Sequence, residues 1–143
     1  MRKPLSPSRK ATADLRVWRE RLGKIPFVKL LGIKLSSLKE TDCEMKMEVV
    51  QKLRNYFGGV HGGVITSLID TAVYFAILPQ VPDTKTLTTT ELKVNFFRPP
   101  RKGILTAKVN IIHLGKRTAV GEARIEDEEG NLVAKGTVGH LIS

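Results

Sequence analysis

The sequence predicts an α+β domain in which a curved antiparallel sheet of about six strands wraps around one long central helix. Residues 62–78 form an almost uninterrupted apolar stretch of helical length, as expected for a helix surrounded by protein on all sides. From Thr86 onward every segment has the composition of a strand, and no second helix separates these segments. Because parallel strands need long crossover connections, we expect the strands to pair antiparallel.

The elements follow one another in a simple order. A turn of helix over 27–31 ends at Gly32, and a short strand over 33–38 comes next. Residues 42–50 alternate strictly, which predicts a half-buried strand whose apolar side chains are Cys43, Met45, Met47 and Val49. Pro79 and Pro82 end the central helix. Four further strands are predicted over 86–97, 104–114, 118–127 and 132–142, separated by turns at 99–103, 115–116 and 129–131.

Length and composition restrict the class of protein. The chain has 143 residues, of which 41% are hydrophobic and 27% charged, and this suits one globular domain and excludes a multidomain enzyme. Its single cysteine, Cys43, excludes an internal disulfide framework and a cysteine-based metal cage. The three histidines lack the spacing of metal ligands. We therefore expect a reduced, cytoplasmic protein without a bound metal or cofactor.

The net charge of +10 is spread unevenly along the chain. Residues 1–29 carry nine Lys and Arg residues against two acids, whereas the rest of the chain is nearly balanced. We expect residues 1–25 to form a basic N-terminal arm with a short helix over 11–22, and residues 26–143 to form the folded domain. That helix would dock through Leu15, Trp18 and Leu22. No apolar run reaches the ~20 residues of a membrane span, so no membrane association is expected.

Asp70 is the only acidic residue between Val50 and Pro82, and it lies in the middle of the apolar helix. Burying an ionised carboxylate without partners is costly, so its presence requires a reason. Either it pairs with a basic residue or a hydroxyl such as that of Thr66, or it acts as a base or nucleophile in a cleft with restricted hydration. Its position alone leaves both interpretations open.

The segment that leads into this helix, residues 55–63, contains four glycines. A helix N-terminus presents unpaired backbone N–H groups, and glycine there lets a ligand oxygen come close to the main chain. His61, Gly62 and Gly63 open the helix in this way, so the Gly62 amide is a candidate donor to an oxyanion. The alternative is a tight loop-to-helix turn in which His61 only caps or packs.

Gly62 and Asp70 are eight residues apart, which corresponds to about 12 Å along a helix. A nucleophile and an oxyanion donor must both lie within about 3 Å of the same reacting carbonyl. If both groups act on one bond, the second must come from another copy of the chain whose helix runs antiparallel across a two-fold axis. The chemistry therefore predicts an isologous homodimer with two equivalent sites.

These residues resemble the signature of a known family. The spaced set Asn55, His61, Gly62, Gly63 and Asp70 is similar to that of the PaaI-like acyl-CoA thioesterases of the hotdog-fold superfamily. The resemblance extends over residues 29–143 and includes the later segments VNFFRP and RIEDEEGNLVAKG. It implies the hotdog fold, a long helix wrapped by an antiparallel sheet, which agrees with the fold predicted from periodicity.

The resemblance also implies catalytic roles. Asp70 would be the nucleophile or general base, and the Gly62 amide of the partner chain would polarise the thioester carbonyl. Asn55 and His61 would orient the thioester and water. A hydroxyl on the strand after the helix would position the water or the carboxylate, and counting back from the later proline pair selects Thr89.

Coenzyme A carries several phosphate charges, which calls for basic residues near the mouth of the cleft. The candidates by loop position are Arg98, Arg101, Lys102, Lys116 and Arg117, and Gly63 is the expected substrate contact on the helix side. Most surface basic residues are simply solvated, which is the alternative for each of these. Tyr74 and Phe75 either line an acyl tunnel or belong to the core, while His113 and His140 are expected to be packing or surface residues.

The sequence thus predicts an enzyme that hydrolyses an acyl- or aryl-acyl-CoA to free acid and CoA without a cofactor. We expect a homodimer as the minimal unit, assembled as a dimer of dimers into a homotetramer. The alternative is a non-catalytic acyl-CoA-binding protein of the same fold. Nucleic-acid binding by the basic arm is not expected, because only 6% of the residues are aromatic and stacking surfaces are scarce.

Overall fold

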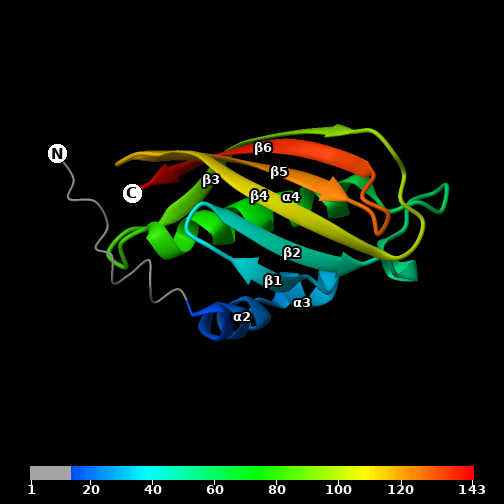
Figure 1. Ribbon diagram of the computed structural model, residues 1–143, viewed down its shortest axis with the longest axis horizontal. Coiled ribbons are helices and arrows are strands. Elements are labelled where there is room, and N and C mark those ends of the chain that lie inside the picture. Colours follow the sequence, from blue (N-terminus) through cyan, green and yellow to red (C-terminus); the bar gives the residue numbers. More distant parts are fainter. Residues whose placement is uncertain (1–13) are drawn as a thin grey trace.

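The computed structural model describes residues 14–143, and its architecture confirms the predicted fold (Figure 1). Two short helices, α2 (Leu15–Gly23) and α3 (Pro26–Leu31), come first. The strands β1 (Lys34–Leu38) and β2 (Asp42–Glu48) follow, and then a short 3-10 turn, η1 (Gln51–Leu53). The long helix α4 (Gly62–Ile77) continues into the turn η2 (Leu78–Gln80). The remaining strands are β3 (Leu87–Phe96), β4 (Ile104–Leu114), β5 (Thr118–Glu126) and β6 (Leu132–Ile142).

All neighbouring strands pair antiparallel, in the order β1-β2-β4-β5-β6-β3. The sheet curves around α4, as Figure 1 shows. Helix α4 packs against β2 to β6, and it buries Ile65, Leu68, Ile69, Ala72 and Val73. Together α4 and η2 are long and apolar enough, by length and composition, to cross a membrane. Their packing inside the curved sheet supplies another reason for that composition.

Two glycines of the sheet let α4 approach closely. A Cβ atom added at Gly121 on β5 would lie 2.6 Å from Val73 Cγ1, and one added at Gly136 on β6 would lie 3.0 Å from Ile69 Cγ2. Both distances are shorter than a relaxed carbon contact. The missing side chains therefore set the depth at which the helix sits in the sheet.

Helix α2 covers the β1 edge of the sheet. Its first turn is capped by the Asp14 carboxylate, which accepts from the Arg16 N–H at 2.9 Å. Leu22 is buried, and Leu15 and Trp18 pack against the core. The Arg19 Nε donates to the Leu35 carbonyl of β1 at 2.7 Å. The predicted docking helix is thus present from Leu15 onward, while residues 11–13 of it, and the rest of the predicted arm before them, lie outside the described residues.

Strand β3 forms the opposite edge, and in the described chain no strand pairs with its outer side. Its pairing with β6 shifts between Thr89 and Glu91, so Thr90 is an extra, bulged residue. A bulge changes which face the following residues occupy. As a result Thr89 lies on the helix side of the strand together with Leu92 and Val94. Without the bulge, strict alternation would place Thr89 on the opposite face from Leu92 and Val94.

Candidate active site

The loop-to-helix turn at Gly62 leaves one backbone donor free. His61 precedes α4 with φ −61° and ψ 134°, and its Nδ1 accepts from the Gly63 N–H at 2.8 Å. The His61 carbonyl accepts from the Val64 N–H at 2.9 Å. The Gly62 N–H has no hydrogen-bond acceptor among residues 14–143. His61 therefore caps the helix while Gly62 keeps an N–H available for a ligand.

Asn55 holds the glycine-rich loop together through its side chain. Its Oδ1 accepts from the Phe57 N–H at 3.0 Å and from the Gly59 N–H at 3.2 Å. Both partners are donors, so the network assigns the oxygen and the nitrogen of this amide. The Asn55 Nδ2 makes no hydrogen bond within the described chain. Gly58, at φ 87°, occupies a backbone conformation that favours glycine, and its carbonyl accepts from Arg54 at 2.6 Å.

A cavity of about 300 Å³ joins this loop to the end of β3. Three residues selected from the sequence line it, namely Asn55, Gly62 and Arg98. The remaining walls are apolar: Val60, Ile65, Phe96, Phe97, Pro99 and Pro100. A Cβ added at Gly62 would lie 3.4 Å from the Phe96 ring, so this ring packs directly over the helix N-terminus. An apolar pocket with a few converging polar groups is typical of a ligand site.

Asp70 and Thr89 meet at a second place on the same helix. The Thr89 Oγ1 donates to Asp70 Oδ1 at 2.8 Å, and both residues are half-buried. No Lys or Arg forms an ion pair with Asp70 within residues 14–143. The Thr66 hydroxyl, an alternative partner from the sequence, donates instead to the Gly62 carbonyl at 2.8 Å. The carboxylate is therefore oriented by one hydroxyl and keeps acceptor capacity for another group.

Two further titratable residues surround Asp70. Tyr74 follows it by one helical turn, and the Tyr74 ring lies 5.9 Å from the ring of His140 on β6. Burial, and to a smaller extent the Asp70 carboxylate, raises the pKa of the Tyr74 phenol. Burial lowers the pKa of the His140 imidazole, an effect that the Asp70 carboxylate partly opposes. Sequence reasoning did not assign His140 to the site; the available signal was a histidine in the apolar alternation of its strand.

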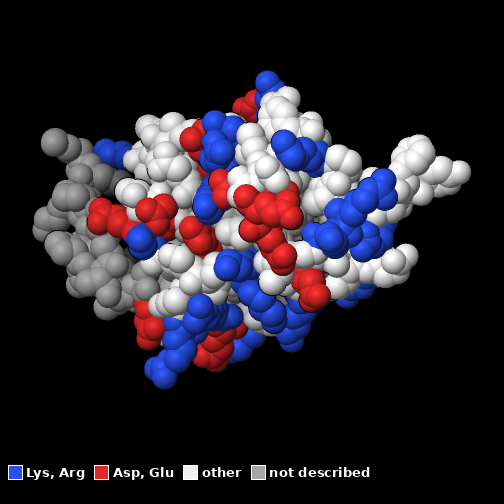
Figure 2. All heavy atoms as spheres, turned by 45° about the vertical axis from the view of Figure 1, so that its right-hand side comes forward, with Lys and Arg blue, Asp and Glu red and all other residues white. Residues whose placement is uncertain are grey.

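The predicted phosphate-binding residues fall into two groups. Arg98 lines the 300 Å³ cavity, and Arg101 donates to the Phe57 carbonyl at 3.0 Å beside it. Figure 2 shows Lys and Arg side chains gathered on its right-hand side, the side on which Figure 1 places the loop before α4. Lys116 and Arg117 lie elsewhere, in the β4–β5 hairpin at the opposite end of the sheet. The single chain therefore does not bring them to Gly62.

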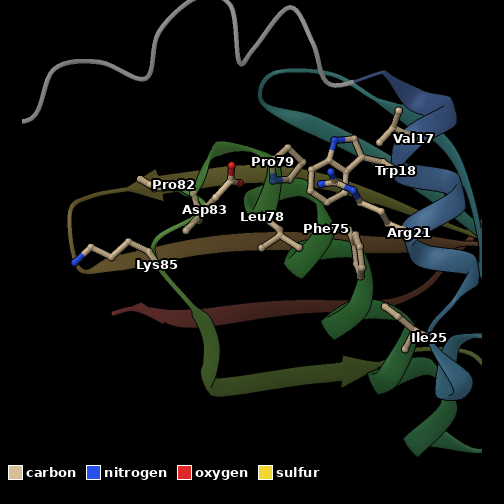
Figure 3. A pocket seen from close by; sticks show the side chains of 11 residues that line it. Val17, Trp18, Arg21, Ile25, Phe75, Leu78, Pro79, Pro82, Asp83 and Lys85 are labelled. Atoms are coloured by element: carbon tan, nitrogen blue, oxygen red, sulfur yellow. The ribbon is translucent and has the colours of Figure 1, made fainter.

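A larger groove, of about 520 Å³, lies between α2 and the C-terminal end of α4 (Figure 3). Its apolar wall includes Trp18 and Phe75, whose rings meet edge to face at 6.2 Å, and Arg21 stacks over Trp18 at 4.7 Å. Phe75 belongs to this wall, whereas Asp70, Gly62 and the other predicted catalytic residues do not line the groove. Volume alone therefore does not identify the reacting site. No cluster of three potential metal ligands occurs within residues 14–143.

Comparison with known proteins connects this arrangement to one family. The model of the thioesterase superfamily matches residues 57–134. The chain is 32% identical to the acyl-coenzyme A thioesterase PaaI of Escherichia coli over 107 residues, 74% of each chain. It is 29% identical to the 1,4-dihydroxy-2-naphthoyl-CoA hydrolase of Listeria monocytogenes over 103 residues, 72% of this chain and 84% of that protein.

Solved structures agree with the sequence comparison. A crystal structure of a thioesterase from Haemophilus influenzae superimposes with a TM-score of 0.86 and 29% identity, covering 94% of this chain and 93% of the other. The match extends over the sheet and the central helix together. The chain therefore belongs to the thioesterase superfamily, as a PaaI-like thioester hydrolase with the hotdog fold.

Proposed function

We propose that the protein hydrolyses an acyl- or aryl-acyl-CoA, using the Asp70 carboxylate of one subunit and the Gly62 N–H of its partner. One observation carries this proposal: α4 holds an oriented carboxylate in its middle and a free backbone N–H at its start, where a cavity opens. The relatives named for acyl-CoA and naphthoyl-CoA substrates support a coenzyme A thioester as the substrate class.

One subunit cannot supply both groups to one carbonyl. The eight residues between Gly62 and Asp70 correspond to about 12 Å of helix rise. The two groups therefore serve one thioester only when a second subunit approaches with its helix antiparallel.

The open edge of β3 supports such an assembly. Thr89, near the start of β3, binds Asp70, and Phe96, at the end of β3, packs over Gly62. The two halves of the proposed site therefore lie toward opposite ends of one edge strand. If two copies pair antiparallel along β3, each Thr89 lies beside the end of the other strand, and both sites are completed at once. Edge strands with unpaired N–H and C=O groups favour pairing of this kind.

The proposed reaction uses groups that the chain leaves free. The thioester carbonyl accepts from the Gly62 N–H, which stabilises the negative charge that develops on its oxygen. Asn55 lines the same cavity, and its Nδ2, which has no partner in the described chain, would donate to the thioester or to a water molecule. The Asp70 carboxylate of the other subunit then follows one of two routes. Either it attacks the carbonyl carbon and forms a mixed anhydride, which water hydrolyses in a second step, or it removes a proton from a water molecule that attacks the carbonyl carbon. In both routes the C–S bond breaks, the thiolate of CoA leaves and takes up a proton, and the free acid is released. Both routes use the same two groups.

The same pairing accounts for the second group of basic residues. The β4–β5 hairpin lies at the end of the sheet where β3 begins, since Leu87 pairs with Ile142 and Thr118 pairs with Leu141. In an antiparallel β3 pair this end is next to the partner's Gly62 end. Lys116 and Arg117 of one subunit then join Arg98 and Arg101 of the other, at a mouth suited to the phosphates of CoA. The dimer of dimers and the cytoplasmic location remain predictions.

The test is complementation between two inactive variants. Asp70→Asn removes the carboxylate, and Gly62→Pro removes the N–H; each alone is expected to lose nearly all release of free thiol from acyl-CoA. Co-expression of both chains forms mixed dimers with one intact site, and random assembly restores about a quarter of the wild-type activity. A mixture as inactive as its components contradicts the shared site.

A panel of acyl-CoA and aryl-acyl-CoA substrates identifies the acyl group in the same assay.

The control for complementation is Asp70→Asn mixed with Asp70→Asn, which forms no intact site. Sedimentation of the wild-type chain checks the assembly, because a monomer with full activity excludes the shared site. Binding of acyl-CoA by the wild type without any thiol release would contradict the proposed hydrolysis.

A further inference from the structure

His140 occupies a position on β6 at which the alternation of the strand predicts an apolar side chain. Val138, His140 and Ile142 follow one another on the core side of β6, and the exposed fraction of His140 is 2%. Within residues 14–143 it is the only buried polar or charged side chain, and both of its ring nitrogens have no hydrogen-bond partner. Buried polar groups are rarely left unpaired, so a histidine kept here requires a reason.

The neighbours of His140 belong to the proposed site. On β3 its paired residue is Thr89, and on β5 it is Ala119, which has no polar side chain. Paired residues of an antiparallel sheet project from the same face, with Cβ atoms about 5 Å apart. From α4 the ring of Tyr74 lies 5.9 Å away, and the charge of Asp70 acts on the imidazole. The polar side chains that these relations bring to His140 are those of Asp70, Tyr74 and Thr89.

We infer that His140 is a positioning residue of the hydrolysis, whose imidazole N–H donates to the Thr89 hydroxyl in the assembled site and directs the Thr89 proton toward Asp70. The inference rests on the proposed function, because it assigns His140 to the same reaction. A threonine hydroxyl has one proton and two acceptor lone pairs. The Thr89 proton already goes to Asp70, so the hydroxyl is free to accept from His140.

A hydrogen bond from His140 makes the order of donors unambiguous. The chain His140 N–H to Thr89 O–H to Asp70 has a single direction, and each bond polarises the next. Burial lowers the pKa of His140 below its ordinary value, which favours the neutral imidazole, in which one nitrogen carries a proton and the other is able to accept. Tyr74 is the remaining polar neighbour among these contacts, with its ring 5.9 Å from that of His140. The contact requires the His140 side chain to rotate about its first two bonds, because neither ring nitrogen bonds to Thr89 in the single chain.

The test is a double-mutant cycle on steady-state kinetics with His140→Leu, Thr89→Val and the combination. His140→Leu is expected to lower kcat about 3- to 10-fold and to change KM less than about 2-fold, the effect of one hydrogen bond. In the Thr89→Val background the same change is expected to alter kcat less than about 2-fold, because the group through which His140 acts is already gone. Ile142→Leu, on the same face of β6, is the matched control and keeps the wild-type kcat.

A structural role and a positioning role differ in two readouts. If His140 only fills space, leucine leaves kcat unchanged or lowers it together with the melting temperature. If it positions Thr89, His140→Leu folds with an equal or higher melting temperature and loses kcat, and His140→Asn, which keeps an N–H near the ring Nδ1, recovers most of the loss. A wild-type kcat in His140→Leu, an equal loss in both backgrounds, or no recovery with asparagine overturns the inference.

Failure of the proposed function is recognised separately. In that case the wild-type chain releases no thiol from any acyl-CoA, whereas failure of the inference alone leaves wild-type turnover intact. The hydrogen bond itself is then read from the ¹⁵N shifts of the His140 ring. Shifts that differ between the wild type and Thr89→Val support the contact, and identical shifts overturn it.

Discussion

Replacement of Gly62 by proline removes one backbone N–H from the helix start at small structural cost. Gly62 is the first residue of α4, a position at which proline is favoured because its N–H has no intrahelical partner. The preceding residue, His61, has φ −61° and ψ 134°, within the extended region that a residue before proline requires. An added Cβ lies 3.4 Å from the Phe96 ring, which is an ordinary contact.

The size of the effect follows from the role proposed for this N–H. Loss of one oxyanion donor lowers kcat by about 100- to 1,000-fold, equivalent to about 3–4 kcal/mol of transition-state stabilisation. Because the Gly62 N–H is free of other partners, Gly62→Pro is expected to fall within that range. Gly62→Ala adds the same Cβ but keeps the N–H, and its kcat is expected to remain within about 3-fold of the wild type.

The assay is release of free thiol from an acyl-CoA at saturating substrate, with circular dichroism and the melting temperature as checks on folding. The decisive quantity is the ratio of kcat between the alanine and proline variants, since both place a Cβ beside Phe96 and only proline removes the N–H. A ratio near one, with both proteins folded, would refute the role of the Gly62 N–H. A ratio of two to three powers of ten agrees with the reasoning.

Three other predictions concern the sheet and the core. Thr89→Val removes a hydrogen bond to the Asp70 carboxylate and should lower kcat about 10- to 30-fold. Thr90→Val, at the exposed bulge, is the control and should keep the wild-type kcat. An equal loss of kcat in both variants contradicts the role of Thr89. Gly121→Ala places a Cβ 2.6 Å from Val73 Cγ1 and should reduce the free energy of unfolding by about 1–3 kcal/mol in a denaturant titration. An unchanged free energy of unfolding argues against the close contact between α4 and β5. Because burial lowers the pKa of His140 in the folded state, the unfolded chain binds more protons below about pH 6.5, and stability should fall as the pH drops through this range. Unfolding curves for His140→Leu should show a smaller decrease, and an equal decrease in both proteins would exclude this origin.

Much of the fold was predictable because its signals are local. The alternation of Cys43, Met45 and Met47 needs only the two-residue period of a strand, and all three are buried. Gly32 ends α3 with φ 72°, a conformation that favours glycine. Strand ends differ by at most two residues from the predictions, as where β2 ends at Glu48 before the turn of η1.

The candidate site was predictable only in part. Counting along β3 selected Thr89 from three successive threonines, and this residue does bind Asp70. The reason that it lies on the helix side is the bulge at Thr90, which depends on pairing with β6 and has no signal in residue spacing. The proximity of His140 to Thr89 depends on the same long-range pairing. The two pairs of basic residues, Arg98 with Arg101 and Lys116 with Arg117, lie in separate turns. The order of the strands places those turns at opposite ends of the sheet.

The sequence by itself determined the elements, the apolar helix with its single carboxylate, the glycine-rich start of that helix and the family signature. These features depend on periodicity, on backbone preferences and on residues close together along the chain. Only the tertiary structure decided that β3 is an open edge, that Thr89 rather than a cation orients Asp70, and that a buried histidine lies beside them. Such contacts join segments far apart in the chain, and they are set by strand order, register and one bulge.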